Sequence, residues 1–452
     1  MMSGPGELFE GMAEVPAPAS REGGTSARLR TAQRDQIELQ IVDLESLLAT
    51  DHPARVVWAY VEQLDLSAAL AAIKAREGEP GRPAADPKIL MALWLYATID
   101  GIGSARALAG LCETHAAYRW ICGGVSMNHH TLSDFRVGQA ALLDRLLAQG
   151  VAGLVSDGLV KLERLAQDGV RVRASAGSSS YRRRPRLESL LEEAEQRVAT
   201  LKEELEADPG ASATRQRAAQ ARAARERVER TKAALERMKE LEAQRERRAK
   251  KHKKATEKQK APRASTTDAE ARVMKMADGG YRPAYNGQFA SDPQTQVIVA
   301  VDLDTSGSDG GLMRPMQEKI AATYGQAPQQ YLVDGGFHKI DDIEAAHAAG
   351  IAVFVPPPNN KHKTDPFAPR EEDGPGTTAW RQRMSSEEGK AIYRERAKHE
   401  CVNAHLRNRS GYRLLVRGRE KVRTVFLWFA VAHNLLRAAA LRGAAAQAAA
   451  TG

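Results

Sequence analysis

The stretch QQYLVDGG, residues 329–336, places an aspartate and two glycines directly after a short apolar run. A bounded run of this kind predicts a buried strand. Asp334 would then end the strand, and Gly335 and Gly336 would form a tight turn. Ligand sites in open α/β sheets lie beyond the carboxyl ends of strands, so Asp334 is a candidate site residue. The glycines after it leave room for close approach by backbone or substrate.

The segments around this strand alternate between strand and helix patterns. Residues 358–384 are polar and rich in proline and glycine, so we expect a loop there. The final residues, 442–452, are expected to be a disordered tail. We predict strands at 281–290, 295–304, 351–360 and 411–418, and helices at 311–325, 339–350, 385–409 and 421–442.

An alternating pattern earlier in the chain predicts another strand. DGVRVRAS, residues 168–175, alternates apolar and basic side chains, and Asp168 opens it. Asp168-Gly169 and Asp334-Gly335 could each be simple turns. Mg²⁺, however, prefers hard oxygen ligands, and two such ions promote phosphodiester cleavage. Carboxylates from different elements would provide those ligands.

The helix predicted at 385–409 has a polar stripe. Arg396, Glu400 and Arg407 follow Tyr393 by 3, 7 and 14 residues, which places all four on one face. A carboxylate with two arginines fits an anionic substrate and a metal ion. The alternative is a solvated face of ion pairs, which the many other charges of this helix also fit.

Residues 181–263 differ from the rest of the chain in charge. They hold 25 basic and 15 acidic residues, whereas the whole chain has a net charge of +9, so the net basicity lies here. Asp208-Pro209-Gly210 predicts a turn between two helices. The basic tail 247–260 could contact DNA phosphates or could be a solvated face and linker. A coiled-coil seam precedes the turn, with spacings of four and three, at Leu187, Leu191, Ala194, Val198, Leu201 and Leu205.

The spacing of apolar residues predicts an all-helical domain at 37–163. Residues 1–36 are rich in Gly, Pro and Ser, and we expect them to form a disordered arm. Short helices with glycine turns fit a helix-turn-helix DNA-binding domain and, equally, a plain helical bundle. His129 and His130 could ligate a metal ion. Adjacent helical side chains point about 100° apart, which favours surface or capping roles instead.

Composition excludes several classes of protein. Aromatic residues are 5% of the chain, which argues against an RNA-binding surface built on base stacking. The three cysteines lack C-x-x-C spacing, which excludes a disulfide scaffold and a cysteine-ligated zinc cluster and suits a reducing cytoplasm. No run approaches 18 uninterrupted apolar residues, so we predict no membrane span. The net positive charge favours polyanionic partners.

The order of these elements resembles a known catalytic core. Their order is similar to that of the RNase H-like core of DDE transposases. The order is a strand with Asp168, two strands, a helix, a strand with Asp334, a helix, a strand, and a helix with Glu400. The late helix matches the Y-x2-R-x3-E-x6-K/R signature of bacterial insertion-sequence transposases at Tyr393, Arg396, Glu400 and Arg407. The resemblance covers residues 37–440 and includes GRPAADPKILMALWLYA (81–97), GIGSARAL (101–108), NHHTLSDFR (128–136) and STTDAEARVM (265–274).

The resemblance implies an α/β RNase H-like core, a mixed sheet with flanking helices, preceded by the all-α DNA-binding domain. Its first strand would lie in 164–180 and its remainder in 264–441, with the basic coiled-coil hairpin 181–263 inserted between them.

The same resemblance assigns roles to individual residues. Asp168, Asp334 and Glu400 would be the catalytic triad and would bind two Mg²⁺ or Mn²⁺ ions. Tyr393 and Arg396 would orient Glu400 and contact DNA phosphate. Arg407 stands where the family more often has lysine, and its planar guanidinium binds phosphate differently. Asp268 and Asp302 are the reserve candidates for the first position.

The function implied is that of a DNA transposase in the bacterial cytoplasm, associated with the nucleoid. It would bind terminal inverted repeats and target DNA as a homodimer in the synaptic complex. A metal-activated water would cut one strand to leave a 3′-hydroxyl, which would attack the other strand or the target. Two alternatives stay open: a metal-dependent nuclease without strand transfer, and a transposase-derived DNA-binding regulator without catalysis.

Overall fold

The computed structural model describes residues 43–451 except 74, 76–77, 79–82, 208–214, 252–260, 359–364 and 411–413. The predicted disordered arm 1–36, the turn at Asp208-Pro209-Gly210 and much of the basic tail 247–260 lie outside the described residues. The chain divides into two compact units, Met1–Asp43 and Leu44–Gly452. Every element below belongs to the second unit.

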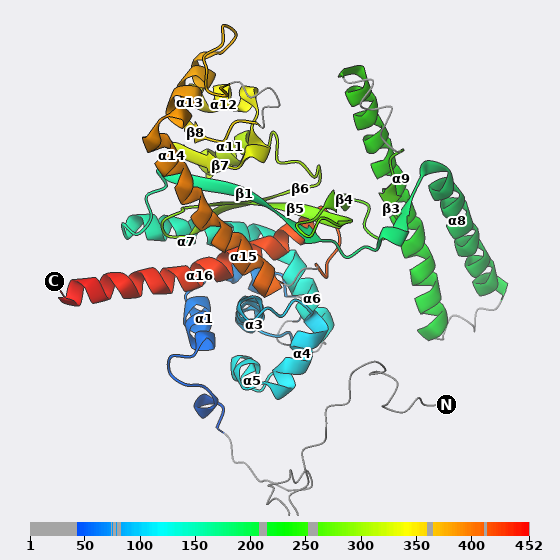
Figure 1. The fold of residues 1–452 in the computed structure, drawn as a ribbon. Helices are drawn as coiled ribbons and strands as arrows, with labels where there is room; N and C mark the ends of the chain where they lie inside the picture. Colours follow the sequence, from blue (N-terminus) through cyan, green and yellow to red (C-terminus); the bar gives the residue numbers. More distant parts are fainter. Residues whose placement is uncertain are drawn as a thin grey trace, which may run out of the picture. The chain divides into compact units, whose positions relative to one another are not determined.

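A six-stranded mixed sheet is built around strand β1 (Arg164–Arg173) (Figure 1). β5 (Tyr281–Ser291) pairs with one edge of β1 in antiparallel orientation, and β7 (Gln330–Val333) pairs with the other in parallel orientation. With its flanking helices, this sheet confirms the predicted fold class. The remaining strands are β8 (Ala352–Phe354), next to β7, and β4 (Arg272–Lys275) and β6 (Ile298–Asp304), which both pair with β5.

One face of the sheet is covered by helices that follow β6 and β7. α11 (Met313–Tyr324) buries Met313, Met316 and Ile320, and α12 (Ile340–Ala348) buries Ile343 and Ala346. These side chains share one apolar cluster with the buried residues of β7 and β8.

The region before the sheet is helical, as predicted. Ser104, Asn128 and Asp86 accept hydrogen bonds from the backbone at helix starts, which satisfies N–H groups that have no partner within the helix. The helices are α1 (Pro53–Glu62), α2 (Ser67–Ala71), α3 (Pro87–Ile99), α4 (Ala105–Thr114), α5 (Ala116–Cys122), α6 (His129–Gly138) and α7 (Ala140–Ser156).

The last helix, α16 (Arg419–Thr451), joins these helices to the sheet. Figure 1 shows it running between them, and it contacts α3, α7 and β6. Phe426 and Phe429 pack on Phe289 of β5, and Trp428 donates to the carbonyl of Arg136 at 2.9 Å. One apolar cluster therefore runs from the N-terminal helices through α16 to the sheet.

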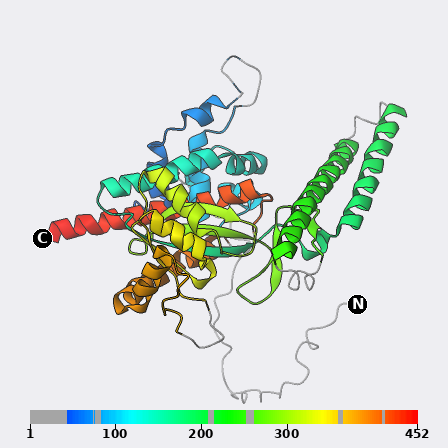
Figure 2. The same cartoon turned by 90° about the horizontal axis from the view of Figure 1, so that it is seen from above.

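The insertion after β1 is a helical hairpin of α8 (Arg184–Ala207) and α9 (Arg215–Lys251), which lie side by side in both views (Figures 1 and 2). Arg184 pairs with Glu242 at 3.0 Å and Glu195 with Lys232 at 3.1 Å, so the helices are antiparallel. The short strands β2 (Tyr181–Arg182) and β3 (Ala264–Ser265) pair where the chain enters and leaves the hairpin. Leu187, Ala194 and Leu201 of the predicted seam are buried, and so are Val228 and Met238 of α9.

The loop predicted at 358–384 is wrong in its second half, where α13 (Pro375–Ser385) forms. Glu344 of α12 accepts hydrogen bonds from the N–H groups of Gly376 and Thr377, which begin this helix. Trp380 is buried and donates to the carbonyl of Val355 at 2.9 Å. The helix depends on partners distant in sequence, so its own composition gave no helical signal.

The single helix predicted at 385–409 is also wrong. The structure has α14 (Glu387–Arg394), a 3₁₀ turn (Glu395–Lys398) and α15 (His399–Ser410). Glu395 pairs with Arg164 of β1 at 2.7 Å, and His399 is fully buried against Ser291 of β5. These two contacts attach the 3₁₀ turn and the start of α15 to the sheet, so the segment does not continue as one straight helix.

Three further predictions need correction. The first strand begins at Arg164, so Asp168 lies within it rather than opening it. No strand forms over 414–418, the described part of 411–418; Leu414 instead makes one hydrogen bond to the carbonyl of Arg173 at 2.8 Å. The tail predicted as disordered at 442–452 is helical through Thr451, because its alanines favour the helix.

By length and composition alone, α16 is apolar enough to cross a membrane. Most of its apolar window is buried inside the structure, which is the arrangement of a core helix.

Gly287→Ala is expected to lower the free energy of unfolding by roughly 1–3 kcal/mol, as overpacking of a core does. The added Cβ would lie 2.5 Å from the buried ring of Phe426. Denaturant unfolding followed by circular dichroism measures the change. Gly153→Ala in α7 is the matched control, because nothing lies within 4 Å of its added Cβ. The control should gain up to about 1 kcal/mol from helix propensity. A Gly287→Ala variant as stable as the original chain would contradict this packing.

Candidate active site

Asp168 and Asp334 lie next to each other at the end of the β1–β7 pairing. The last paired residues are Gln167 and Val333, and each aspartate follows directly. Burial raises the pKa of Asp168 to about 6, and the negative charge of Asp334 contributes in the same direction. The structure therefore brings together two of the three predicted catalytic carboxylates.

Backbone and side-chain donors fix both carboxylates. Asp168 Oδ1 accepts from the N–H of Gly169 at 2.8 Å, and its Oδ2 accepts from Asn403 Nδ2 of α15 at 2.9 Å. Asp334 Oδ1 accepts from the N–H of Gly336 at 2.8 Å, which caps the 3₁₀ turn Gly335–Phe337. The tight turn predicted after Asp334 is present.

Glu400, the third predicted carboxylate, lies in the first turn of α15 with its side chain 62% exposed. It pairs with Arg396 Nη2 at 3.0 Å, while Arg396 Nη1 lies 3.8 Å from Asp168 Oδ2. Arg396 thus bridges Glu400 and Asp168. Glu400 is connected to Asp168 through this guanidinium, and no described interaction joins Glu400 directly to Asp168 or Asp334.

The other residues of the polar stripe take different positions. The guanidinium of Arg396 lies over the ring of Tyr393, 5.9 Å from its centroid. Arg407 donates from Nε to the carbonyl of Asn403 on its own helix at 3.3 Å. Tyr393 ends α14, Arg396 lies in the 3₁₀ turn, and Glu400 and Arg407 lie on α15. The four residues therefore do not share the face of one continuous helix.

The reserve candidates lie elsewhere. Asp268 is buried and accepts from the hydroxyl of Tyr285 at 2.7 Å. Burial raises the pKa of Asp268. Asp302 lies on β6, where its carboxylate accepts from the N–H of Leu303 at 2.8 Å. Asp168, by contrast, lies beside Asp334 and stays the predicted first carboxylate.

Two residues near this site were missed in the sequence. Asn403 donates a hydrogen bond to Asp168, but nothing in the sequence around Asn403 marks it as different from the other polar residues of its helix. Asp309 follows β6, and its charge also raises the pKa of Asp168. A signal for Asp309 existed, because Asp309-Gly310-Gly311 repeats the Asp334-Gly335-Gly336 pattern.

Comparison with known proteins agrees with this arrangement. Residues 42–138 match the family described as Transposase domain (DUF772), and residues 250–435 match the family described as Transposase DDE domain. The chain belongs to the DDE transposases. The second match contains Asp334 and Glu400, whereas Asp168 lies between the two matched ranges. No curated protein and no solved structure matches the chain.

DDE transposases use divalent metal ions. Among the described residues, no group of three or more His, Cys, Asp or Glu side chains is arranged to hold one. The donor set is nevertheless of the right kind, because Mg²⁺ needs only one or two carboxylates beside water and substrate phosphate. Asn403, whose Nδ2 donates to Asp168, has a buried Oδ1 without a hydrogen-bond partner among the described residues. Asp168 and Asp334 therefore provide oxygen ligands of the kind that a hard cation binds, with an unpaired amide oxygen on the neighbouring Asn403.

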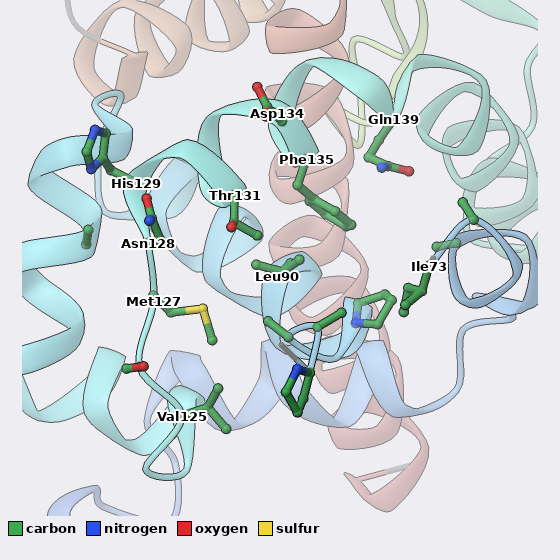
Figure 3. A pocket seen from close by; sticks show the side chains of 18 of the residues that line it. Ile73, Leu90, Val125, Met127, Asn128, His129, Thr131, Asp134, Phe135 and Gln139 are labelled. Carbon is green, nitrogen blue, oxygen red and sulfur yellow. The ribbon is translucent and has the colours of Figure 1, made fainter. Parts of the chain in front are cut away.

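A groove in the N-terminal region of the transposase is separate from this site. In Figure 3, Leu90, Met127 and Phe135 line it together with His129 and Asp134. All of its lining residues lie between Ala69 and Gln139, so it contains none of the predicted site residues. His129 and His130 open α6, with their rings 4.1 Å apart.

Asp168→Asn is expected to stabilise the metal-free transposase above pH 6. The pKa of about 6 in the folded chain exceeds the ordinary value of 3.8. Between these values the folded state keeps a proton that the unfolded state releases, so the free energy of unfolding falls as pH rises. The variant has no carboxylate to lose this proton. Its free energy of unfolding should therefore exceed that of the original chain by roughly 2–3 kcal/mol above pH 6.5.

Denaturant unfolding in EDTA from pH 4 to pH 8 measures this difference, which should shrink toward pH 4. Asp341→Asn, whose side chain is 86% exposed on α12, is the control and should follow the original chain. A gain for Asp168→Asn that does not depend on pH would show that Asp168 is not held in a charge-disfavouring environment.

Proposed function

We propose that this transposase cleaves the ends of its element and joins them to target DNA in a reaction that requires divalent metal ions. The adjacency of Asp168 and Asp334, produced by the β1–β7 register, is the observation that carries the proposal. Phosphoryl transfer of this kind needs oxygen ligands from separate elements that are fixed before the substrate arrives. Both aspartates meet that requirement, since each is held by a backbone N–H group.

Asp168, Asp334 and Glu400 would hold the ions. A bound ion would lower the pKa of the attacking water and stabilise the leaving oxygen. The side-chain amide of Asn403 orients Oδ2 of Asp168, and the backbone N–H of Gly336 orients Oδ1 of Asp334. Glu400 is placed one helical turn from Asn403, on the same helix.

Arg396 would be the phosphate-binding group of the site. Its guanidinium has the planar geometry that matches phosphate, and it now occupies the space between Asp168 and Glu400. A DNA phosphate would compete with these carboxylates for the guanidinium. The release of Glu400 from Arg396 would make its carboxylate available beside the two aspartates.

The α8–α9 hairpin would add electrostatic affinity for DNA. It belongs to the segment that carries the chain's net basicity. Phosphate contacts by such residues are independent of sequence and weaken as salt rises. We propose that this affinity supports binding of terminal inverted repeats and target DNA, and that two copies act together because two ends must be joined.

Glu400→Gln is expected to lose Mg²⁺-dependent cleavage of duplex ends of the element while binding the same DNA with nearly unchanged affinity. The loss should exceed the roughly 10–100-fold that removal of an outer-shell partner costs a metal site. Nicking assays and gel-shift titrations of the full chain measure the two properties.

Glu388→Gln is the matched control, because Glu388 is an exposed glutamate on the neighbouring helix α14. It should cleave like the original chain. Full cleavage by Glu400→Gln would refute its place in the site, and cleavage without strand joining by the original chain would indicate a nuclease instead.

A further inference from the structure

Asp309 lies in the loop between β6 and α11, with its side chain 14% exposed. Its Oδ1 accepts two hydrogen bonds from amide groups of β5, from Asn286 Nδ2 at 2.6 Å and from Gln288 Nε2 at 2.9 Å. Both donors are buried and neutral. They fix the carboxylate without neutralising its charge.

A chain of buried hydrogen bonds sets the direction of one of these donors. The hydroxyl of Tyr331 on β7 donates to Gln167 Oε1 at 2.8 Å, and Gln167 Nε2 donates to Gln288 Oε1 at 2.8 Å. Since the oxygen of Gln288 is thereby occupied, its amide nitrogen faces Asp309. Tyr331, Gln167 and Gln288 are at most 2% exposed. A buried network of polar side chains costs free energy unless every hydrogen bond in it is made. Side chains of β7, β1 and β5 therefore together fix the position of the Asp309 carboxylate.

Asp309 lies close to Asp334 at Gly336, and it lies against the face of β1 opposite to the side chain of Asp168. A Cβ on Gly336 would lie 3.0 Å from Asp334 Oδ1 and 3.6 Å from Asp309 Oδ2, so both carboxylates approach the same glycine. A Cβ on Gly169, the residue after Asp168, would overlap with Asp309 Oδ1. Side chains at either position would push Asp309 away from the site.

The negative charge of the Asp309 carboxylate has no cationic partner within hydrogen-bonding distance among the described residues. Arg171 Nη2 is 3.8 Å from Asp309 Oδ2, longer than a charge-assisted hydrogen bond. Asn286 Oδ1 is buried and has no hydrogen-bond partner among the described residues, and it lies 2.7 Å from the position of the same Gly169 Cβ. Carboxylate and amide oxygens are ligands that a hard cation binds, and Asp309 Oδ2 is the oxygen that approaches Gly336.

We propose that Asp309 is a further carboxylate of the metal-binding site, which shares a divalent cation with Asp334 at the Gly336 turn. This inference rests on the proposed function, because it adds a ligand to the same site. It also adds to Asp168 and Asp334 a third carboxylate that does not depend on the release of Glu400 from Arg396.

Asp309→Asn tests this role because asparagine keeps an oxygen that can accept from Asn286 and Gln288 while removing the charge. Mn²⁺ binding to the full chain without DNA is measured by electron paramagnetic resonance of free Mn²⁺. We expect the affinity to fall at least about tenfold. Asp341→Asn is the control and should bind as the original chain does, and Asp168→Asn and Asp334→Asn should weaken binding.

If Asp309→Asn binds Mn²⁺ like the original chain while Asp168→Asn and Asp334→Asn lose affinity, Asp309 is only a loop anchor, and the proposed function stands. If the original chain and all variants bind equally weakly, the metal site itself is refuted together with this inference. Thermal unfolding checks that the variants are folded. Should Asp309→Asn unfold at a lower temperature than the original chain, Asp309→Ser, which removes the carboxylate without adding bulk, makes the same comparison.

Discussion

The parallel pairing of β1 with β7 is the constraint on which the candidate site depends. Gln167 opposite Val333 places Asp168 and Asp334 side by side, although the chain between them is long and includes the helical hairpin. A shift of one residue would turn Asp168 to the other face of the sheet. The buried bond from Tyr331 to Gln167 ties the side chains of the two strands and favours this register over others. The cost of closing so long a connection grows only slowly with its length, so local pairing can secure it.

α16 imposes a second constraint, because one apolar cluster contains residues of the N-terminal helices, α16 and the sheet. Arg423 pairs with Asp144 of α7 at 2.7 Å, and the side chain of Asn434 satisfies both the N–H and the carbonyl of Ile298 on β6. The helical region and the sheet are therefore parts of one cooperative structure rather than two domains on a linker. Contacts made by the N-terminal helices are carried to the sheet through packed side chains.

Much of this arrangement could be predicted from the sequence where local pattern decides structure. The strands around Val301 and Leu332, the helices around Ile320 and Ile343, and the placement of Asp334 before two glycines follow from apolar spacing and turn residues. The errors arise where distant partners decide. α13 depends on a cap from Glu344, and the break before α15 depends on Glu395 reaching Arg164. Asp309 was missed because its role comes from amides on β5, whose alternating Asn286 and Gln288 look like ordinary strand polarity.

The way the hairpin joins the sheet bears on how this chain could have evolved. Tyr181 pairs with Ser265, and Arg182 pairs with Ala264, so the chain leaves and re-enters at adjacent points. An ancestor with a short connection at this place would have needed no change in the sheet to acquire α8 and α9. Insertion, loss or exchange of such a segment leaves the neighbouring strands where they were, so its length and charge can change without altering the sheet. The sheet that carries the candidate site and the charged hairpin can thus diversify separately within one polypeptide.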